Sequence, residues 1–485
     1  MKTKSIAINT ILNTFRMTLT ILVPLVTYPY ITRIFGSDGI GQYEWVKSVV
    51  SIFTLIASMG ITTYAIREGA KVKYSREKFS KLAHELFFLN LCSTIVCYAI
   101  LFALITYVPK FSMYRIYLLI YSVNIGLSAL SLDWVYSVYE DYLYITVRQV
   151  IVQVVSIVGL FTLVHTKNDL IIYIIITTVS NSGANIFNFL KSRKYIDFKL
   201  QQHYDLLIHL VPVLVFFGTR FAMNAYNSID TFILGMLSTN DSVGYYNAAV
   251  KINTILVTFF TAMSPVYLPR MMMYVTEKNG TQYQQLLKKV VQLKTMLMYP
   301  IVCGLFLFAP EIIWLIAGTG FEPAVFTLRI LCFVLCFVLF SSIVQKDYMI
   351  PMGQEKTVLF LTVFAAVLNI AVSCALIVTV GYNGAAIGSL IAEATVFTIG
   401  AIIVRNEGVN LFTLIPKSSY KYFLSACVMS FACVYIHKVF LSSIAIIMIG
   451  IPLAAIIYFI TLILLRDQFT IDSTKSLYRK IIKKR

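Results

Sequence analysis

The stretch "NTFRMTLTILVPLVTYPY", residues 13–30, places one arginine inside a run of apolar and hydroxylated residues. It belongs to an apolar segment over residues 6–31, which is long enough for a helix to cross a hydrocarbon core about 30 Å thick. The segment is longer than the apolar core of a signal peptide, and Arg33 and a glycine-rich turn follow it instead of a small-residue cleavage site. We therefore interpret it as a membrane span that carries a charged side chain, Arg16.

The composition places most of the chain in lipid. Of its 485 residues, 59% are hydrophobic and 13% are charged, and its mean hydropathy is +0.80. A soluble domain has about 25% charged residues. Because lipid offers no partner to backbone N–H and C=O groups, the apolar spans must be helices. We predict an all-α integral membrane protein with about 14 transmembrane helices, over residues 6–31, 45–66, 83–108, 115–138, 145–164, 170–190, 206–235, 244–268, 294–317, 325–346, 357–380, 384–404, 421–440 and 443–465.

Two parts of the sequence repeat one arrangement. Arg16 precedes Gly41 of "GIGQYEWVKS" at nearly the same distance as Arg220 precedes Gly244 of "SVGYYNAAVK". A repeat of six spans keeps one orientation, so the two halves would be related by an axis along the membrane normal. We expect two pseudo-symmetric six-helix lobes around a central cavity. The expected divisions are residues 1–205 (spans 1–6), residues 206–420 (spans 7–12), and residues 421–485 (spans 13 and 14 with a basic cytoplasmic tail).

The positive charge is unevenly placed. The formal net charge of +18 could indicate nucleic acid, but about 30 of the 40 lysines and arginines fall in loops on the side of the N-terminus. This bias predicts a multi-pass protein with both termini in the cytoplasm and basic blocks that bind anionic lipid headgroups. No nucleic-acid partner is expected. The eight cysteines lie in apolar runs without metal or redox spacing, so we interpret them as packing residues and expect no metal site.

Polar side chains form stripes along the first, second, sixth, seventh and eighth spans. They recur at spacings of three, four or seven residues, which places them on one face of each helix. Polar faces of lipid-embedded helices point at one another or at water, so the stripes predict a hydrophilic cavity lined by both halves. The candidate substrate-binding residues on these stripes are Asn13, Arg16, Lys47, Asn181, Asn185, Arg220, Asn224, Asn227 and Lys251.

Arg16 and Arg220 lie in the middle to inner half of their spans, with no acid one helical turn away. A charge at mid-bilayer costs about 2.5–3.5 kcal/mol on insertion scales, so each arginine needs a partner. The planar fork of arginine suits phosphate, and we favour a pair of cavity arginines that bind an anionic cargo. Hydrogen bonds to the backbone of neighbouring helices are the alternative. For Lys251 an ion pair with Asp230 is favoured, and Lys47 can also snorkel to the interface.

No catalytic motif stands out. The five histidines are scattered and form neither an HExxH motif nor a ligand cluster. Walker, GxSxG and kinase signatures are missing from the sequence, and the outer loops are too short for a folded catalytic domain. We therefore expect a transporter and no enzyme.

The most specific stretch is "SLDWVYSVYEDYLYITVRQ", residues 131–149. Its Asp133, Trp134, Glu140 and Arg148 match a signature of the Wzx-type polysaccharide repeat-unit flippases. The chain resembles this group, which belongs to the polysaccharide transporter family and is related to the multidrug and toxin extruders and the lipid II flippases. Without the family, an aromatic belt at the interface with a Glu140–Arg148 contact explains the same stretch. Three further segments look like the same family: residues 227–252, 349–356 and 381–393.

The resemblance implies the cargo. It implies an undecaprenyl-diphosphate-linked oligosaccharide that is assembled inside and flipped to the outer leaflet of the bacterial cytoplasmic membrane, for capsule, exopolysaccharide or O-antigen synthesis. The implied partners are membrane lipids, a polysaccharide polymerase and other assembly proteins. No cofactor is expected beyond a coupling proton or sodium ion, for which Glu393, Asp230 and Glu311 are the candidate sites. The alternatives are a multidrug exporter, a lipid II flippase and, from another class, a membrane polysaccharide polymerase or ligase. The excess of intramembrane cations over acids argues against export of cationic drugs.

Overall fold

The structure is a computed structural model that describes residues 6–199, 204–408, 418–440 and 442–472, without the side chains of residues 6–22, 219–220, 222–227 and 265. Within these ranges the chain forms helices joined by short loops, and it forms no strand. The predicted all-α fold is confirmed. The chain divides into two compact units, Met1–Gly244 and Tyr245–Arg485. The lobes expected from the repeat have other bounds, and they stay a prediction.

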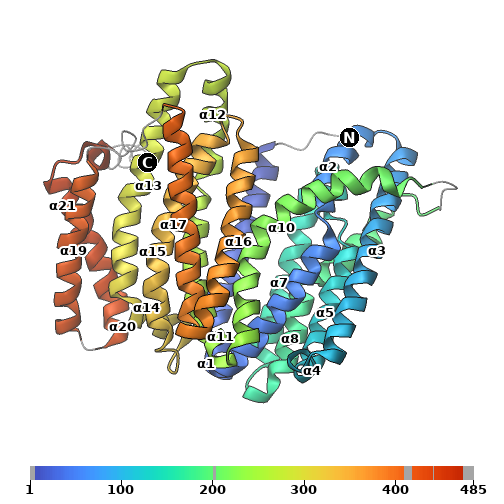
Figure 1. Ribbon diagram of the computed structural model, residues 1–485, viewed down its shortest axis with the longest axis horizontal. Helices are drawn as coiled ribbons and strands as arrows, with labels where there is room; N and C mark the ends of the chain where they lie inside the picture. The colour runs from blue at the N-terminus through green and yellow to red at the C-terminus, as the bar shows by residue number, and fades with distance from the viewer. Residues whose placement is uncertain (1–5, 200–203, 409–417, 441, 473–485) are drawn as a thin grey trace. The chain divides into compact units, whose positions relative to one another are not determined.

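The first unit is built around α1 (Ile6–Ser58), which packs against α3, α5, α7 and α10. Several of its helices are short and follow one another end to end, as the blue and green ribbons of Figure 1 show. The bounds of the others are α2 Ile61–Val72, α3 Arg76–Tyr107, α4 Pro109–Met113, α5 Arg115–Ala129, α6 Asp133–Val138, α7 Tyr142–Leu163, the 3₁₀ turn η1 Lys167–Asp169, α8 Leu170–Thr178, the π-helical turn η2 Val179–Gly183, α9 Ala184–Ser192 and α10 Leu206–Leu237.

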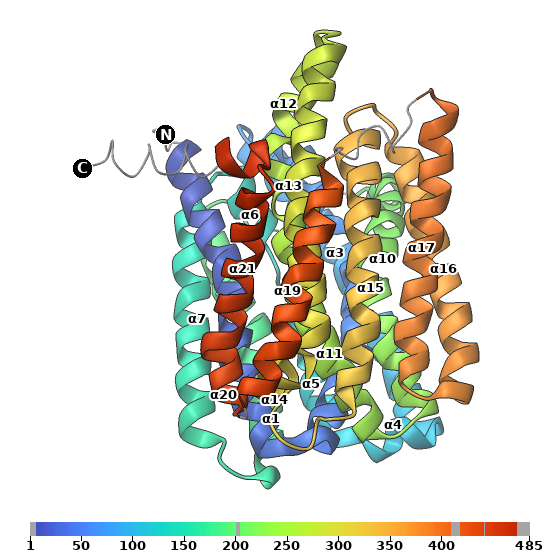
Figure 2. The same ribbon diagram turned by 90° about the vertical axis from the view of Figure 1, so that its left-hand side faces the viewer.

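The second unit pairs α16 with α17, α15 with α17, and α19 with α21, while α13 packs against both α15 and α19. The α12–α13 hairpin extends beyond the ends of the neighbouring α15 and α17, as Figure 2 shows. The bounds, with α11 beginning at the end of the first unit, are α11 Asn240–Thr261, α12 Ser264–Thr276, α13 Gly280–Leu307, α14 Ala309–Ala317, α15 Ala324–Ser342, η3 Ile343–Met349, α16 Glu355–Val380, α17 Asn383–Asn406, α19 Ser419–Val439, α20 Ser443–Ala445, η4 Ile446–Gly450 and α21 Ile451–Leu464.

Among the described residues, eleven helices are long and apolar enough to cross a membrane, or up to twelve if the bent pair α11–α12 is one span. The chain is therefore a multi-pass membrane protein. The 53 residues of α1 reach about 80 Å at 1.5 Å per residue, more than twice the thickness of a hydrocarbon core. The helix breaks at Gly36, where φ is 66° and ψ is −170°, so its two arms match the first two predicted spans. The predicted count of fourteen requires both arms of α1 and α10 to cross, and it stays a prediction.

Helix α7 has the reverse of the polarity of a soluble helix. Its Arg148, Gln153 and Ser156 are buried, whereas Val154 and Val155 are 52% and 59% exposed. An apolar outer face has no reason to form in water, but it matches acyl chains, and the polar groups then face the interior of the protein. The outer face of α7 therefore contacts lipid.

The two glycine motifs of the repeat meet within the first unit. A Cβ added at Gly41 would lie 1.8 Å from the backbone oxygen of Asn240, and one added at Gly244 would lie 2.2 Å from the backbone oxygen of Ser37. Each turn thus presents a glycine and, four residues earlier, a backbone oxygen to the other. Reciprocal contacts of this kind are those of a two-fold axis, and they support the predicted repeat.

Hydrogen bonds join the same two turns. Asn240 donates from Nδ2 to Asp38 Oδ1 over 2.9 Å, and the Ser37 hydroxyl donates to Asp241 Oδ1. The Tyr114 hydroxyl donates to Asn240 Oδ1 over 2.8 Å and ties the contact to the loop before α5. We call this contact the glycine-turn lock; it consists of residues 37–41 and 240–244.

Candidate functional site

A polar cavity of about 190 Å³ lies inside the first unit. Its wall is formed by α1, α2, α3, α5, α6, η2 and α9, so the second and sixth predicted spans both contribute polar side chains to it. None of the lining residues is charged, and each of them lies in the described part of the chain. The polar side chains on the wall are Thr54, Ser58, Thr62, Asn90, Ser128, Ser131, Ser182 and Asn185.

Several of these groups are held by their own helices. Thr54, Ser58 and Ser128 each donate their hydroxyl hydrogen to a backbone oxygen three or four residues earlier, over 2.8, 3.0 and 2.7 Å. A hydroxyl that donates in this way keeps lone pairs that can accept from a ligand. Asn185 donates from Nδ2 to Leu127 O over 3.0 Å, where α5 approaches its end. The wall is therefore rich in acceptors.

The two candidate asparagines of the sixth predicted span, Asn181 and Asn185, lie in different surroundings. Asn185 lines the cavity, whereas Asn181 is exposed and donates to the Tyr121 hydroxyl over 2.9 Å. Both residues stay candidate substrate ligands.

Lys47 has a partner that the sequence analysis missed. Its Nζ lies 2.8 Å from Glu44 Oε2 and 5.7 Å from the ring centre of Tyr43. The spacing of three residues is the signal that could have found this pair. Lys251 lies in α11 of the second unit and Asp230 in α10 of the first, so their expected ion pair stays a prediction.

For Arg16 and Arg220, the two predicted phosphate ligands, the structure describes only the backbone. Arg16 belongs to α1 and Arg220 to α10. The side chains of Asn13, Arg16, Arg220, Asn224 and Asn227 lie outside the described residues. Their proposed contacts with an anion therefore stay predictions.

The three candidate coupling acids lie in three different helices. Asp230 in α10 is buried, and Glu393 in α17 is half-buried. Glu311 in α14 lies with Oε1 3.2 Å from His437 Nε2. Its Oε2 is buried and accepts no hydrogen bond within the described ranges. Within those ranges no group of three or more His, Cys, Asp or Glu residues could hold a metal ion.

The motif residues form a cluster around Asp133. Arg148 donates from Nη2 to Asp133 Oδ1 over 3.1 Å, and Asn188 donates from Nδ2 to the same oxygen over 2.6 Å. Arg148 also donates from Nη1 to Ala184 O over 3.3 Å. The expected Glu140–Arg148 contact is wrong, because Glu140 sits at a positive φ of 56° in the turn between α6 and α7 and is exposed.

The aromatic side chains near this cluster form a packed layer. Trp134 lines the cavity and packs on Phe79, with ring centres 5.4 Å apart. Tyr139 and Tyr195 stack at 4.4 Å. Burial raises the pKa of Tyr195 to about 12, and the nearby Asp141 carboxylate adds to the shift, so this phenol is neutral at physiological pH. The layer belongs to a buried hydrophobic cluster of the first unit, so the aromatic belt at the interface stays a prediction.

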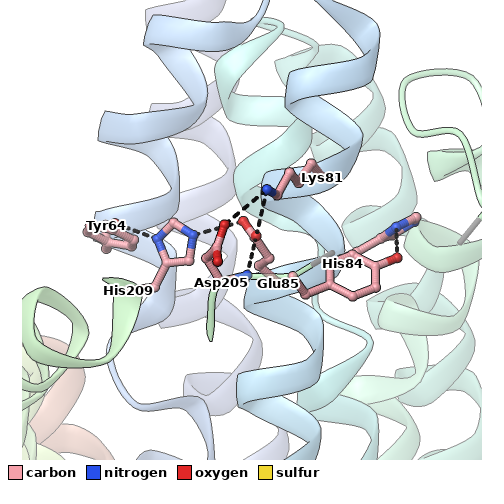
Figure 3. A network of polar contacts seen from close by, with 7 residues as sticks. Tyr64, Lys81, His84, Glu85, Asp205 and His209 are labelled. Carbon is pink, nitrogen blue, oxygen red and sulfur yellow. Dashed lines mark hydrogen bonds and ion pairs between the residues drawn. The ribbon is translucent and has the colours of Figure 1, made fainter. Parts of the chain in front are cut away.

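A second polar network fixes the start of α10 (Figure 3). Glu85 Oε1 accepts from the backbone N–H of Asp205 over 2.9 Å, and His209 Nε2 lies 2.9 Å from Glu85 Oε2. His209 Nδ1 lies 2.7 Å from the Tyr64 hydroxyl, and Lys81 pairs with Asp205 over 3.2 Å. These contacts join α2, α3 and α10. The helix that carries Arg220 therefore begins at a position determined by α3.

The second unit holds a buried ion pair that the sequence analysis also missed. Lys294 in α13 and Asp347 in η3 are each 1% exposed and form a hydrogen-bonded ion pair. Lys294 donates in addition to the hydroxyls of Ser264 and Ser342 over 3.2 and 3.3 Å. All three hydrogens of the ammonium group are thus used, and four helical segments meet at one charge. Their separation along the chain leaves no local signal for the pair.

The fold and the cavity together define a multi-pass helical membrane protein with a polar interior among its spans. The profile of the family "Polysaccharide biosynthesis protein" matches residues 6–275, which is more than half of the chain. The chain belongs to this family.

The curated relatives have low sequence identity to this chain, but two of them align with most of its length. A putative O-antigen transporter of Shigella dysenteriae is 21% identical over 380 residues, covering 77% of this chain and 94% of the relative. A putative O-antigen transporter of Escherichia coli (strain K12) is 21% identical over 394 residues, covering 80% and 93%. A probable low-salt glycan biosynthesis flippase of Haloferax volcanii is 24% identical over 169 residues, covering 35% and 36%. The relatedness thus extends over most of the chain.

The fold is similar to that of two groups of solved transporters. The lipid II flippase MurJ in an inward closed conformation has a TM-score of 0.72 at 14% identity, covering 98% of this chain and all of that one. An inward-facing multidrug resistance MATE family transporter has a TM-score of 0.56 at 15% identity, covering 80% and 98%. At these identities the likeness concerns the fold, which matches the expected architecture.

Proposed function

We propose that this protein is a flippase for undecaprenyl-diphosphate-linked oligosaccharide repeat units. It carries them by alternating access from the inner to the outer leaflet of the bacterial cytoplasmic membrane, where they enter capsule, exopolysaccharide or O-antigen synthesis. The observation that carries the proposal is an uncharged polar cavity of about 190 Å³ among membrane-spanning helices of a polysaccharide biosynthesis protein. Because one fold can host several functions, the curated O-antigen transporters are a necessary second support.

The cargo has three parts that need three surroundings. The diphosphate is met by Arg16 and Arg220, whose planar guanidinium groups suit phosphate oxygens. The sugars meet hydroxyl and amide groups in the interior, and the prenyl chain stays in lipid. A polysaccharide polymerase and other assembly proteins would receive the product outside.

The expected topology puts both termini in the cytoplasm and the glycine-turn lock on the outer side. The lock then closes the outer end of the pathway in this conformation, and its opening releases cargo outward. Flipping needs a difference in affinity between the two states. A proton or sodium ion bound at Glu393, Asp230 or Glu311 can supply that difference, as can consumption of the product outside.

Export in a strain that lacks the chromosomal copy tests the function. Arg16→Ala and Arg220→Ala should each abolish surface polysaccharide, while membrane fractionation shows the protein inserted at normal level. Arg16→Lys should also export poorly, because lysine cannot form the two parallel hydrogen bonds of arginine. Normal export by both alanine variants would contradict the role of the arginines.

The multidrug exporter is the second candidate, since its fold is shared. Expression of this chain in a drug-sensitive host distinguishes the two. A flippase restores polysaccharide and leaves resistance to cationic drugs unchanged, whereas raised resistance without polysaccharide would favour the exporter.

A further inference from the structure

Three membrane-spanning segments are interrupted where they line the cavity. Between α1 and α2, Met59 and Gly60 have φ values of 45° and 67°. Between α5 and α6 the helix stops over residues 130–132, and between α8 and α9 the chain forms the π-helical turn η2. Irregular backbone is tolerated at membrane depth only where protein or water replaces the lost partners. Three interruptions around one cavity are the architecture of a binding site in transporters.

The cavity also holds a buried polar group without a partner. Asn90 in α3 is 8% exposed, and its amide oxygen makes no hydrogen bond within the described ranges. Ser131 and Ser182 also line the cavity, and Ser182 is 7% exposed. A buried polar group that lacks a partner destabilises the protein. A ligand or water that satisfies Asn90 therefore binds favourably.

The chemistry of the wall selects the ligand. No lining residue is charged, which excludes the diphosphate and any ionised group. Donors at Asn90 and Ser182 stand beside hydroxyls that can only accept, and sugar hydroxyls both donate and accept. The rings of Trp134 and Phe87 offer apolar surface to the C–H face of a sugar ring. The volume of about 190 Å³ is below the roughly 300–1,000 Å³ of pockets for drug-sized ligands and suits one monosaccharide.

We propose that this cavity of the first unit binds a single uncharged sugar residue of the lipid-linked saccharide. The inference rests on the proposed flippase function and adds to it. It separates recognition of the sugar, by Asn90 and Ser182, from recognition of the diphosphate by the arginines. The residues around the cavity then determine which sugar the protein accepts.

Binding of two lipids by the full-length protein in nanodiscs tests this separation. The probes are undecaprenyl diphosphate alone and undecaprenyl diphosphate that carries one glucose, galactose or N-acetylglucosamine. The wild type should bind at least one sugar-bearing lipid roughly tenfold more tightly than the bare lipid, since two or three hydrogen bonds are gained. Asn90→Leu and Ser182→Val should remove this preference and leave the affinity for the bare lipid unchanged.

Matched controls exist in the same unit. Asn124 is a buried asparagine with an unpartnered Oδ1, and Ser156 a buried serine with an unpartnered hydroxyl, but neither lines the cavity. Asn124→Leu and Ser156→Val should therefore keep the preference. Ser182→Ala removes only the hydroxyl and serves where the larger substitutions prevent folding.

The outcomes separate the two proposals. Equal binding of the bare lipid and all three sugar-bearing lipids by the wild type would mean that the cavity holds water only, and it would overturn the inference while the flippase function stands. A preference that survives in Asn90→Leu and Ser182→Ala would also overturn it. If no undecaprenyl diphosphate lipid binds, the flippase function itself fails.

Discussion

Replacing Gly41 by alanine should open the glycine-turn lock. The new Cβ would lie 1.8 Å from the backbone oxygen of Asn240, whereas a carbon and a carbonyl oxygen approach to about 3.3 Å. The two turns must therefore separate by about 1.5 Å. A shift of this size lengthens the 2.9 Å hydrogen bond between Asn240 and Asp38 beyond its working range.

The magnitude follows from these contacts. One hydrogen bond contributes about 1 kcal/mol, and overpacking of a close contact costs about 1–3 kcal/mol. The closed turn thus loses about 3 kcal/mol relative to an open one, which is a shift of roughly 100-fold in their populations. Export should fall, because the outer end of the pathway then no longer closes between transport cycles.

A cysteine at Val243 reports the opening. Val243 is 1% exposed in the closed turn, and a membrane-impermeant maleimide added to intact cells can label Val243→Cys only when the turns part. Mass spectrometry of the labelled peptide distinguishes this position from the native cysteines. Gly41→Ala should raise the labelling rate by up to about 100-fold. Gly159→Ala is the control, since its Cβ would contact only the Ile176 side chain, at 3.7 Å.

An unchanged labelling rate in an inserted Gly41→Ala protein would refute the reasoning, because the turns would then tolerate a side chain between them. Equal acceleration by Gly159→Ala would show a general loss of stability instead of a local opening.

Three further changes probe the rest of the structure. The double variant Ser37→Cys, Asp241→Cys should form a disulfide that stops export until a reducing agent is added, while each single variant exports in both conditions. Export at the wild-type rate by the oxidised double variant would contradict closure by the lock. Lys294→Met should lower the free energy of unfolding by about 3–5 kcal/mol, because it leaves a buried carboxylate unpaired. Adding Asp347→Leu should restore most of this stability, as measured by thermal unfolding of the purified protein. No recovery would show that the unpaired carboxylate is not the cause. Asp133→Asn should reduce stability by about 1–3 kcal/mol, since the buried arginine beside it loses its charged acceptor, and a melting point equal to that of the wild type would rule out a structural role for the cluster.

The interrupted helices illustrate what the periodicity of the sequence misses. Residues 45–66, 115–138 and 170–190 were expected as continuous spans, and each is broken where it lines the cavity. Apolar length predicts that a segment crosses the membrane, but it does not report where a helix stops inside it. Only Gly60 gives a local hint, because glycine adopts positive φ without strain.

The sequence pattern also did not reveal which acidic residue pairs with Arg148. Arg148 was expected beside Glu140 and pairs with Asp133, because the turn at Glu140 directs that residue outward. The Lys47–Glu44 pair is local and could have been found from its spacing. A local pair is encoded by helix geometry, while a distant one depends on which helices pack together.

The amino-acid sequence by itself determined that the chain is helical and multi-pass, because lipid leaves the backbone no other way to satisfy its polar groups. Only the tertiary structure decided which polar side chains share a space. Asn90 and Ser182 lie far apart in the chain and meet at one cavity. Such a site arises from the packing of several helices, and no spacing along one helix encodes it.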